Sequence, residues 1–311
     1  MNLQQFRFVR ETIRQNFNLT EAARQLYSSQ PGVSKAIIEL EDELGITIFE
    51  RHGKRLRGLT KAGEAVSVII DDIMRQVDNL KRLSDDLAEK EEGSLMIGCT
   101  HAQARYFLPK ILMEFKKKFP KVRVSLSEGD PPQLAKRLLH DEVDIAFATE
   151  TLSSVSGLVT LDCYEWEHVL VMNQDHPLSQ LTTSEAKQIS LAQIQQYPLI
   201  TYDRAFSGRT AIDKAFAKQN LVPDIVLEAV DADVIKTYVD LDMGLGIIAG
   251  MAFDPRRDSG LIHIPVGHLF GRHITRLALR KGVFVRDYLY EFVKMCTVDS
   301  LERDELDEIL S

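Results

Sequence analysis

The stretch 18–49 constrains the fold most, because it spells two short amphipathic helices separated by a tight turn. In the first helix, Thr20 is placed to act as the N-cap ahead of Glu21. The apolar residues that follow fall on one face at helical spacing, and they are Ala22, Ala23 and Leu26. We therefore predict a short packing helix that ends at a turn.

The second helix is predicted to begin near Gln30. Ser28 and Ser29 offer hydroxyls that can cap it, and Pro31 is tolerated because the first N–H groups of a helix have no intrahelical partner. Its inward face is apolar at a spacing of three or four residues and consists of Val33, Ile37, Leu40 and Leu44. Two helices joined in this way predict a helix-turn-helix.

Polar side chains occupy the outward face at the start of this second helix, and they are Gln30, Ser34 and Lys35. In a helix-turn-helix, this end of the second helix enters the major groove of DNA. There, glutamine can bond adenine, serine can bond either type of base, and lysine can bond a guanine or a phosphate. We therefore expect double-stranded DNA as a partner.

A basic hairpin is predicted next. Residues 46–49 alternate like a strand, and residues 50–58 hold four cations within seven residues and have glycines where a hairpin must turn. Alone, such a run fits a solvated loop equally well, but after a two-helix unit we favour a wing that contacts phosphates. The residues expected to contact DNA are Ser28, Ser29, Gln30, Pro31, Ser34, Lys35, Arg51, Lys54 and Arg55.

Charge and composition exclude several classes of protein. The net charge of the 311 residues is −8, yet residues 1–60 carry nine lysines and arginines against seven acids. No apolar run is long enough to cross a bilayer and the N-terminus lacks a signal-peptide pattern, so we expect a cytoplasmic protein. Three isolated cysteines favour structural thiols over a metal site, although Cys99 lies beside the site predicted below and redox sensing is an alternative.

A long helix is predicted from Thr60, which can cap it, to about residue 89. It carries a heptad-like apolar seam that consists of Val66, Ile70, Ile73, Val77, Leu80 and Leu87. The seam could pack on its own domain. We favour pairing with a second copy, which would present two recognition helices to the inverted half-sites of a promoter.

From residue 93 onward, strands and helices alternate. Strands at 94–100, 122–126 and 143–148 with helices between them predict a parallel sheet with right-handed crossovers, and a similar pattern recurs over 199–279. We therefore predict an α/β fold with two lobes behind the winged helix-turn-helix. The expected domains are the DNA-binding domain 1–59, the linker helix 60–92 and the effector domain 93–311, with lobe I at about 93–163 and 268–311 and lobe II at about 164–267.

Candidate ligand groups lie at the ends of these strands, where helix N-termini present free N–H groups to anions. The strand ends deliver Thr100, His101, Ala102, Gln103, Thr149, Glu150, Thr201 and Tyr202. Neutral donors of this kind suit a small anion or zwitterion. The alternative is that each threonine only caps the helix that follows it.

No catalytic constellation emerges from the sequence. The histidines are dispersed, the HExxH and GxSxG motifs do not occur, and Gly244 and Gly246 lack the third glycine of a dinucleotide loop. Asp231 and Asp233 are better placed to cap a helix than to act as acid and base. We therefore expect no enzyme, cofactor or metal site. A solute-binding receptor is a remote alternative, since it would not need residues 1–60.

The whole chain resembles the LysR-type transcriptional regulators. Two narrower motifs, Thr-His-Ala-Gln-Ala-Arg-Tyr at 100–106 and Asp-Ala-Asp-Val-Ile-Lys-Thr-Tyr at 231–238, resemble the branch that controls cysteine biosynthesis and sulfur assimilation. The resemblance implies a homotetrameric regulator, mainly an activator, that works with RNA polymerase and responds to sulfate, thiosulfate, O-acetylserine or N-acetylserine. A regulator of sulfonate utilisation, or of another pathway, is the alternative.

Carried over by position, this resemblance implies that Thr100, Gln103, Thr149 and Thr201 bind the effector. Two residues depart from the pattern of the branch. Ala102 stands where the branch has a second threonine, which removes a hydroxyl donor. Asp203 stands where the branch tends toward a neutral residue, and its carboxylate would repel an anion if it faced the cleft.

Overall fold

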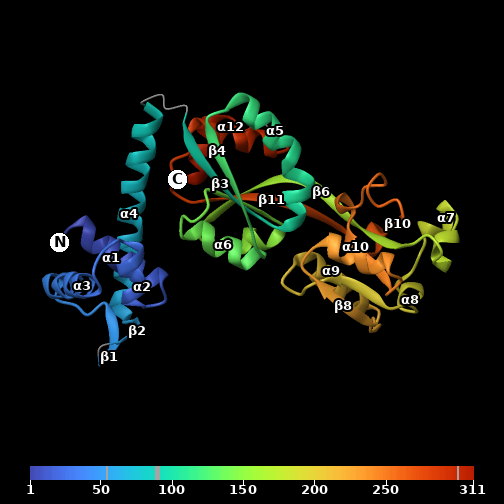
Figure 1. Ribbon diagram of the computed structural model, residues 1–311, viewed down its shortest axis with the longest axis horizontal. Coiled ribbons are helices and arrows are strands. Elements are labelled where there is room, and N and C mark those ends of the chain that lie inside the picture. The colour runs from blue at the N-terminus through green and yellow to red at the C-terminus, as the bar shows by residue number, and fades with distance from the viewer. Residues whose placement is uncertain (54, 88–91, 300) are drawn as a thin grey trace. The chain divides into compact units, whose positions relative to one another are not determined.

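The computed structural model describes residues 1–53, 55–87, 92–299 and 301–311, and it divides into two compact units (Figure 1). Met1–Glu89 together with Gly282–Arg286 form the first unit, and Lys90–Lys281 together with Asp287–Ser311 form the second. Within the described ranges, none of the helices combines the length and the apolar character needed to cross a bilayer.

The first unit opens with a helix that the sequence pattern did not reveal. Its N-cap is Asn2, whose side chain accepts hydrogen bonds from the backbone N–H groups of Gln4 and Gln5, each at 3.0 Å. Phe6 and Val9 are buried on its inner face. The elements of this unit are α1 (Leu3–Arg14), α2 (Leu19–Gln25), α3 (Gln30–Leu44), β1 (Phe49–His52), β2 (Arg55–Leu59) and α4 (Lys61–Leu87).

The predicted helix-turn-helix is α2 and α3, with one difference at its start. Asn18 caps α2, because its side chain accepts hydrogen bonds from two backbone N–H groups of the first turn, and Thr20 therefore lies inside the helix. Ser29 caps α3 as predicted and accepts a hydrogen bond from the N–H of Gly32 (3.2 Å). Gly45 ends α3 with a φ of 67°, a conformation that glycine adopts without strain.

The core of the first unit contains three of the four apolar residues predicted to face inward from α3. Val33, Ile37 and Leu40 are fully buried. The prediction was wrong for Leu44, which is 38% exposed, because it lies in the last turn of α3 next to the chain reversal at Gly45. The inward face of the recognition helix therefore ends one turn earlier than its spacing suggested.

The wing is a short antiparallel hairpin of β1 and β2. Of the strand predicted at 46–49, only Phe49 is in β1, and the carbonyl of Ile48 accepts a hydrogen bond from the N–H of Thr60 (2.9 Å) beyond the end of the hairpin. Gly63 allows this close contact, since a Cβ atom there would lie 2.0 Å from the Ile48 oxygen. Lys54, at the tip of the predicted hairpin, lies outside the described residues.

Helix α4 has two apolar faces where the sequence suggested one seam. Thr60 precedes it as predicted, and its hydroxyl accepts a hydrogen bond from the N–H of Gly63 (2.9 Å). Ile70 and Met74 are buried in the core of the first unit. Another set of apolar side chains is exposed, and it consists of Val68, Ile69, Leu80, Leu83 and Leu87. Part of the predicted seam thus packs on its own domain, and the other apolar face is exposed.

The second unit is α/β with two lobes, as predicted (Figure 1). Lobe I is the part around β3 (Gly93–Cys99), η1 (Gln103–Phe107), α5 (Leu108–Lys118), β4 (Val122–Glu128), α6 (Pro131–Leu139), β5 (Ile145–Ala148), η2 (Glu150–Ser154), β11 (Arg272–Arg280), α12 (Asp287–Cys296) and α13 (Arg303–Leu310). Lobe II is the part around η3 (Pro177–Gln180), α7 (Thr183–Ala186), α8 (Leu191–Ile194), β7 (Leu199–Tyr202), α9 (Ser207–Lys218), β8 (Ile225–Ala229), α10 (Ala232–Asp240), β9 (Leu245–Ala249), η4 (Gly250–Ala252), β10 (Leu261–Pro265) and α11 (Gly267–Phe270).

One long strand, β6 (Leu158–Asn173), belongs to both lobes. Its first part pairs with β11 of lobe I, and its last part pairs with β9 and β10 of lobe II. The strands follow the order β4-β3-β5-β11-β6-β9-β7-β8. In lobe I, β3 is parallel to β4 and β5, and in lobe II β7 is parallel to β8 and β9. Two strands, β11 and the crossing strand β6, connect these parallel sets, since β5 pairs with β11 and β9 pairs with β6.

The three cysteines, Cys99, Cys163 and Cys296, are all buried and form no disulfide. Burial raises the pKa of Cys99 to about 12 and that of Cys163 to about 12. Their thiols therefore stay protonated at neutral pH. Because the thiolate is the reactive form, this favours structural thiols over the redox-sensing alternative considered for Cys99.

Candidate DNA-reading surface and effector pocket

The first turn of α3 and the wing face the same hollow on the first unit. Gln30 from α3 and Arg55 from β2 line it, together with Asn16 and Thr20 from the segment around the start of α2. Because α3 and β2 pack against the same core, Gln30 and Arg55, which are 25 positions apart in the sequence, meet at one surface. Two of the side chains predicted to contact DNA are thus brought together.

The other predicted residues of α3 surround this hollow with different exposure. Lys35 is 80% exposed and lies 3.7 Å from Glu39 on the solvent side of the helix. Ser28, Ser29 and Pro31 are exposed, and Ser34 is half-buried. The sequence analysis missed Tyr27, which is 99% exposed with a φ of 49° in the turn before α3. Its aromatic ring adds to the same surface.

Arg51 in the wing has a structural contact that the sequence did not reveal. Its guanidinium lies 2.7 Å from one carboxylate oxygen of Glu41, whose side chain is only 9% exposed. The other oxygen of Glu41 accepts hydrogen bonds from the backbone N–H groups of Ile48 (2.7 Å) and Phe49 (3.1 Å). A buried carboxylate requires such partners. Arg51 therefore braces the wing on α3, whereas Arg55 is exposed to solvent.

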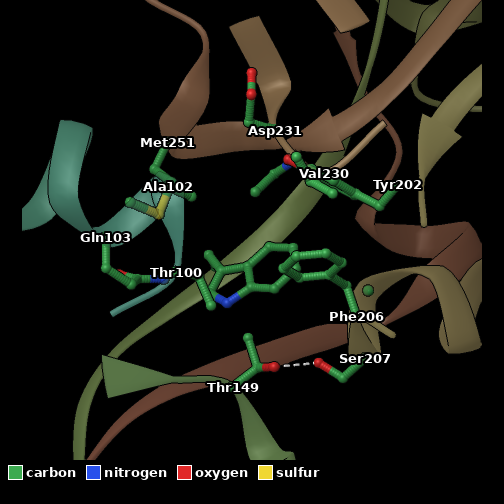
Figure 2. Close-up of a pocket in the computed structure, with 13 residues that line it drawn as sticks. Thr100, Ala102, Gln103, Thr149, Tyr202, Phe206, Ser207, Val230, Asp231 and Met251 are labelled. Atoms are coloured by element: carbon green, nitrogen blue, oxygen red, sulfur yellow. Dashed lines mark hydrogen bonds between the residues drawn. The ribbon is translucent and has the colours of Figure 1, made fainter. Parts of the chain in front are cut away.

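A pocket of about 40 Å³ lies in the second unit, beyond the carboxyl ends of β3, β5 and β7 (Figure 2). It contains five of the candidate residues from the strand ends, Thr100, Ala102, Gln103, Thr149 and Tyr202. Its other lining residues are Trp166, Phe206, Ser207, Gly208, Val230, Asp231, Ala249 and Met251. The strand-end argument therefore finds the pocket but only part of its lining.

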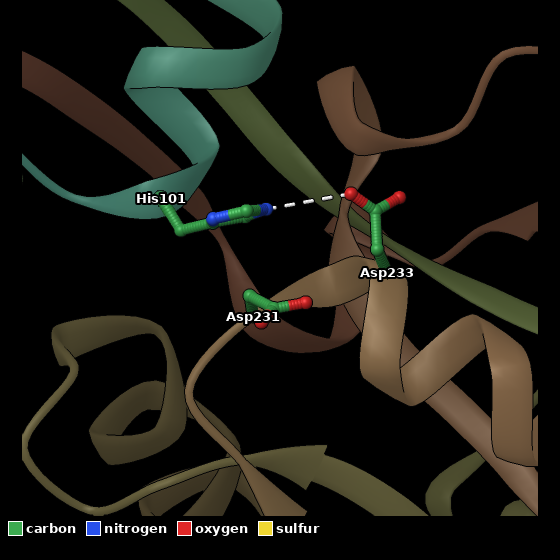
Figure 3. Close-up of side chains that lie close together, drawn as sticks. All are labelled: His101, Asp231 and Asp233. Carbon is green, nitrogen blue, oxygen red and sulfur yellow. Dashed lines mark hydrogen bonds and ion pairs between the residues drawn. The ribbon is translucent and has the colours of Figure 1, made fainter. Parts of the chain in front are cut away.

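Two further predicted residues lie outside this lining. Thr201 is fully buried, and its hydroxyl donates a hydrogen bond to the carbonyl of Ile247 (3.2 Å), so that it joins β7 to β9. His101 lies at the rim and contacts Asp233 (Figure 3). The side chain of Glu150 lies outside the described residues. Asp203 accepts a hydrogen bond from the N–H of Ala205 (2.9 Å) within its own loop.

The polar groups of the pocket gather at one end. The hydroxyls of Thr149 and Ser207 hydrogen-bond to each other there, and Thr100 lies nearby (Figure 2). Ser207 begins α9, whose N-cap Phe206 makes no side-chain cap, so the first N–H groups of this helix remain donors. The indole nitrogen of Trp166 is buried and has no hydrogen-bond partner among the described residues. This end can therefore donate several hydrogen bonds to an anionic group.

Other polar side chains of the lining already have partners. The Gln103 carbonyl accepts a hydrogen bond from Tyr164 (2.6 Å), and its amide donates to Thr275 (3.4 Å). The Tyr202 hydroxyl accepts a hydrogen bond from the N–H of Ala249 (3.1 Å). Asp231 accepts one from the first turn of α10 (2.8 Å), as the predicted N-cap. These residues present mostly their apolar surfaces to the cavity.

A polar network joins the two lobes at the rim of the pocket. Tyr106 of lobe I donates a hydrogen bond to Asp233 of lobe II (2.6 Å), and Arg105 forms an ion pair with the same carboxylate. Lys236 lies 3.2 Å from Asp233 and 2.9 Å from Asp258. Desolvation raises the pKa of Asp233, but the hydrogen bonds from Tyr106 and Lys236 outweigh it and lower the pKa. The two narrow sequence motifs thus meet in one contact.

His101, Asp231 and Asp233 also have the geometry of a candidate metal site. Their potential ligand atoms all lie within 4.8 Å of one another (Figure 3). Asp233, however, already binds the cations of Arg105 and Lys236. A divalent ion would have to compete with both positive charges. The geometry therefore fits an ion-pair network better than a metal centre.

The winged helix-turn-helix and the two-lobed pocket domain define a DNA-binding regulator with a small-molecule effector domain. Residues 3–64 match the bacterial regulatory helix-turn-helix proteins of the lysR family, and residues 88–297 match the LysR substrate binding domain. The chain belongs to the LysR family of transcriptional regulators and is not an enzyme. This confirms the family resemblance and the fold class inferred from the sequence.

Named relatives support the narrower resemblance as well. The chain is 54% identical to the HTH-type transcriptional regulator CysB of Burkholderia cenocepacia, over 100% of this chain and 97% of that protein. It is 42% identical to the regulator cbl of Escherichia coli, over 99% and 97% of the two chains. The crystal structure of the cofactor-binding domain of the Cbl transcriptional regulator matches with a TM-score of 0.66 and 38% identity, over 71% of this chain and 94% of that one. The chain is therefore similar to the CysB and Cbl regulators.

Proposed function

We propose that the protein regulates genes of cysteine biosynthesis and sulfur assimilation, mainly as an activator, in response to a sulfur- or serine-derived effector. It acts in the cytoplasm as a homotetramer, a dimer of dimers, that binds inverted half-sites and contacts RNA polymerase. Similarity to CysB and Cbl over nearly the whole chain supports this proposal. The exposed apolar face of α4 supports self-association.

One observation carries the effector proposal. Thr100, Ala102, Gln103 and Thr149 come from the ends of two different strands and line one pocket, with the start of α9 beside them. Hydroxyls and helix N–H groups at one end suit an anionic group of the effector. The lining holds neither lysine nor arginine, so these neutral donors carry the recognition.

Effector binding would act on DNA through the relative position of the lobes. The pocket has walls from both lobes, and the network around Asp233 joins the same lobes at its rim. An effector that binds one arrangement of the lobes more tightly shifts the population toward it, by no more than its difference in affinity. A change in the geometry of the tetramer would then alter the spacing and bending of the bound DNA.

Calorimetry on the full chain tests the effector proposal. Sulfate, thiosulfate, O-acetylserine and N-acetylserine are titrated separately, and at least one is expected to bind. Thr100→Val should weaken that binding at least tenfold, since a hydrogen bond to a charged group is worth about 1.5–3 kcal/mol. Thr210→Val is the matched control, because Thr210 is exposed on α9 and does not line the pocket. Absence of binding by all four compounds would contradict the proposal.

A further inference from the structure

The effector pocket has one polar end, and hydrocarbon covers most of the remaining wall. Thr100, Thr149 and Ser207 supply the hydroxyls of the polar end. The rest of the wall is formed by the carbon atoms of Ala102, Tyr202, Phe206, Val230 and Met251 and by the ring of Trp166, whose indole nitrogen belongs to the polar end. Figure 2 shows Val230, Met251 and Ala102 across the cavity from Thr149 and Ser207. A ligand that fills this space therefore meets donors on one side only.

The charge of the lining also favours a ligand that has a polar group at one end only. The thirteen lining residues include neither lysine nor arginine, and their one charged side chain is the carboxylate of Asp231. Asp231 caps α10, and in Figure 2 its carboxylate points away from Thr149. Burying a charge costs free energy unless hydrogen bonds or opposite charges compensate for it. A dianion such as sulfate would leave part of its charge against apolar groups, whereas a monoanion with an apolar body would not.

Ala102 strengthens this argument. It lines the pocket on the apolar side, close to Met251 in Figure 2, at a position where a hydroxyl would have offered a second donor. A methyl group there removes a partner for an inorganic anion. It also adds to the hydrocarbon part of the lining, to which Phe206 and Val230 belong.

From these observations we infer that the preferred ligand of this pocket is an organic sulfonate, whose oxygens bind at the Thr100, Thr149 and Ser207 end and whose carbon chain packs on the apolar wall. This inference rests on the proposed function, since it names the class of sulfur compound that the same pocket takes. Three sulfonate oxygens match a set of converging hydroxyl and helix N–H donors, and the single charge limits the cost of burial.

Calorimetry with a homologous series tests the inference on the full chain. Methane-, ethane-, propane- and butanesulfonate are compared with sulfate and with pentanoate, the carboxylate of matched chain length. Affinity should rise by about fourfold for each buried methylene group until the cavity is filled. Sulfate should bind more weakly than ethanesulfonate, and pentanoate more weakly than butanesulfonate.

Two variants connect the result to the wall itself. Val230→Thr replaces a methyl group on the wall with a hydroxyl and should weaken butanesulfonate about threefold or more while leaving methanesulfonate unchanged. Val234→Thr is the matched control, because Val234 is also partly exposed but does not line the pocket. Ala102→Thr restores a hydroxyl and should shift the preference toward sulfate.

The outcomes separate this inference from the proposed function. If sulfate binds as tightly as butanesulfonate, or if affinity does not grow with chain length, the inference is overturned and the proposed function stands. The same holds if only an acetylserine binds. If pentanoate binds more tightly than butanesulfonate, the inferred preference for a sulfonate head group is overturned. If none of these compounds and none of the acetylserines binds, both the inference and the proposed effector class fail.

Discussion

The imidazole of His101 joins the two lobes of the effector domain through Asp233. Its Nε2 atom lies 3.4 Å from the Asp233 carboxylate in lobe II (Figure 3), and its Nδ1 atom lies 3.0 Å from the Glu128 carboxylate in lobe I. A neutral imidazole can donate through only one nitrogen, whereas the protonated ring donates to both carboxylates. Protonation of His101 should therefore hold the lobes together more firmly.

A pH dependence of stability follows from this contact. Desolvation lowers the pKa of His101, but hydrogen bonds to Glu128 and Asp233 outweigh it and raise the pKa above 6.5. The stabilisation of the folded state by protonated His101 is thus complete below pH 6.5, and it is lost as the pH rises through the raised pKa of His101. Urea unfolding of wild type and His101→Gln should diverge most at acidic pH, by no more than about 1 kcal/mol because the pair is partly exposed. Parallel stability curves from pH 6 to about 8 would contradict the assignment.

The buried carboxylate of Glu41 leads to a second prediction, about the wing. Glu41→Ala leaves two N–H groups at the start of the wing without their acceptor, which should destabilise the first unit by about 1–3 kcal/mol. Glu39→Ala is the control, because the Glu39 side chain is 55% exposed, and its cost should stay within about 0.5 kcal/mol. Thermal unfolding measures both. Equal stability of the two variants would show that Glu41 does not brace the wing.

The sequence predicted the elements of this fold well and the helix-turn-helix contacts in part. Regular spacing of apolar residues revealed α3 and α4, and the alternation of strands and helices revealed both lobes. The structural role of Glu41 could not be predicted from such patterns. Four of the five residues 39–43 are acidic, and the partners that distinguish Glu41, Ile48 and Phe49, come from the next segment. Burial of an acid depends on such tertiary contacts and not on spacing.

The pocket shows the same limit. Its strand-end residues, Thr100 and Thr149, were predictable because parallel strands bring their carboxyl ends together. Trp166 and Met251 were not, because they come from the crossing strand and from a short helical turn in which no periodic pattern marks the side that faces the cavity. Of the two candidates at the end of β7, Tyr202 lines the pocket and Thr201 does not, since adjacent strand residues point to opposite faces and the strand pattern did not say which face borders the pocket.

Self-association through α4 is the third prediction. Ile69, Leu80, Leu83 and Leu87 lie on its exposed apolar face, and the spacing of the last three is that of a coiled-coil seam. The double variant Leu80→Lys with Leu83→Lys should reduce the mass measured by analytical ultracentrifugation at micromolar concentration. Val222→Lys, at an 80% exposed residue of lobe II, is the control and should leave the mass unchanged. A double variant with the wild-type mass would exclude this face as the interface.

The DNA-reading surface yields the last prediction, in which Lys35 and Arg55 should behave alike and Arg51 should behave differently. Lys35 is 80% exposed and Arg55 is exposed beside Gln30, so each is free to neutralise a phosphate. Lys35→Ala and Arg55→Ala should each weaken DNA binding and reduce the slope of log affinity against log salt by about one. Arg51, in contrast, is held by Glu41. Arg51→Ala should lower affinity by loosening the wing, with a smaller change in slope.

Fluorescence anisotropy over a salt series measures these slopes, with Lys117→Ala in the effector domain as the control. Unchanged slopes for Lys35→Ala and Arg55→Ala would place the phosphate contacts elsewhere, because a lost phosphate contact always releases fewer counterions.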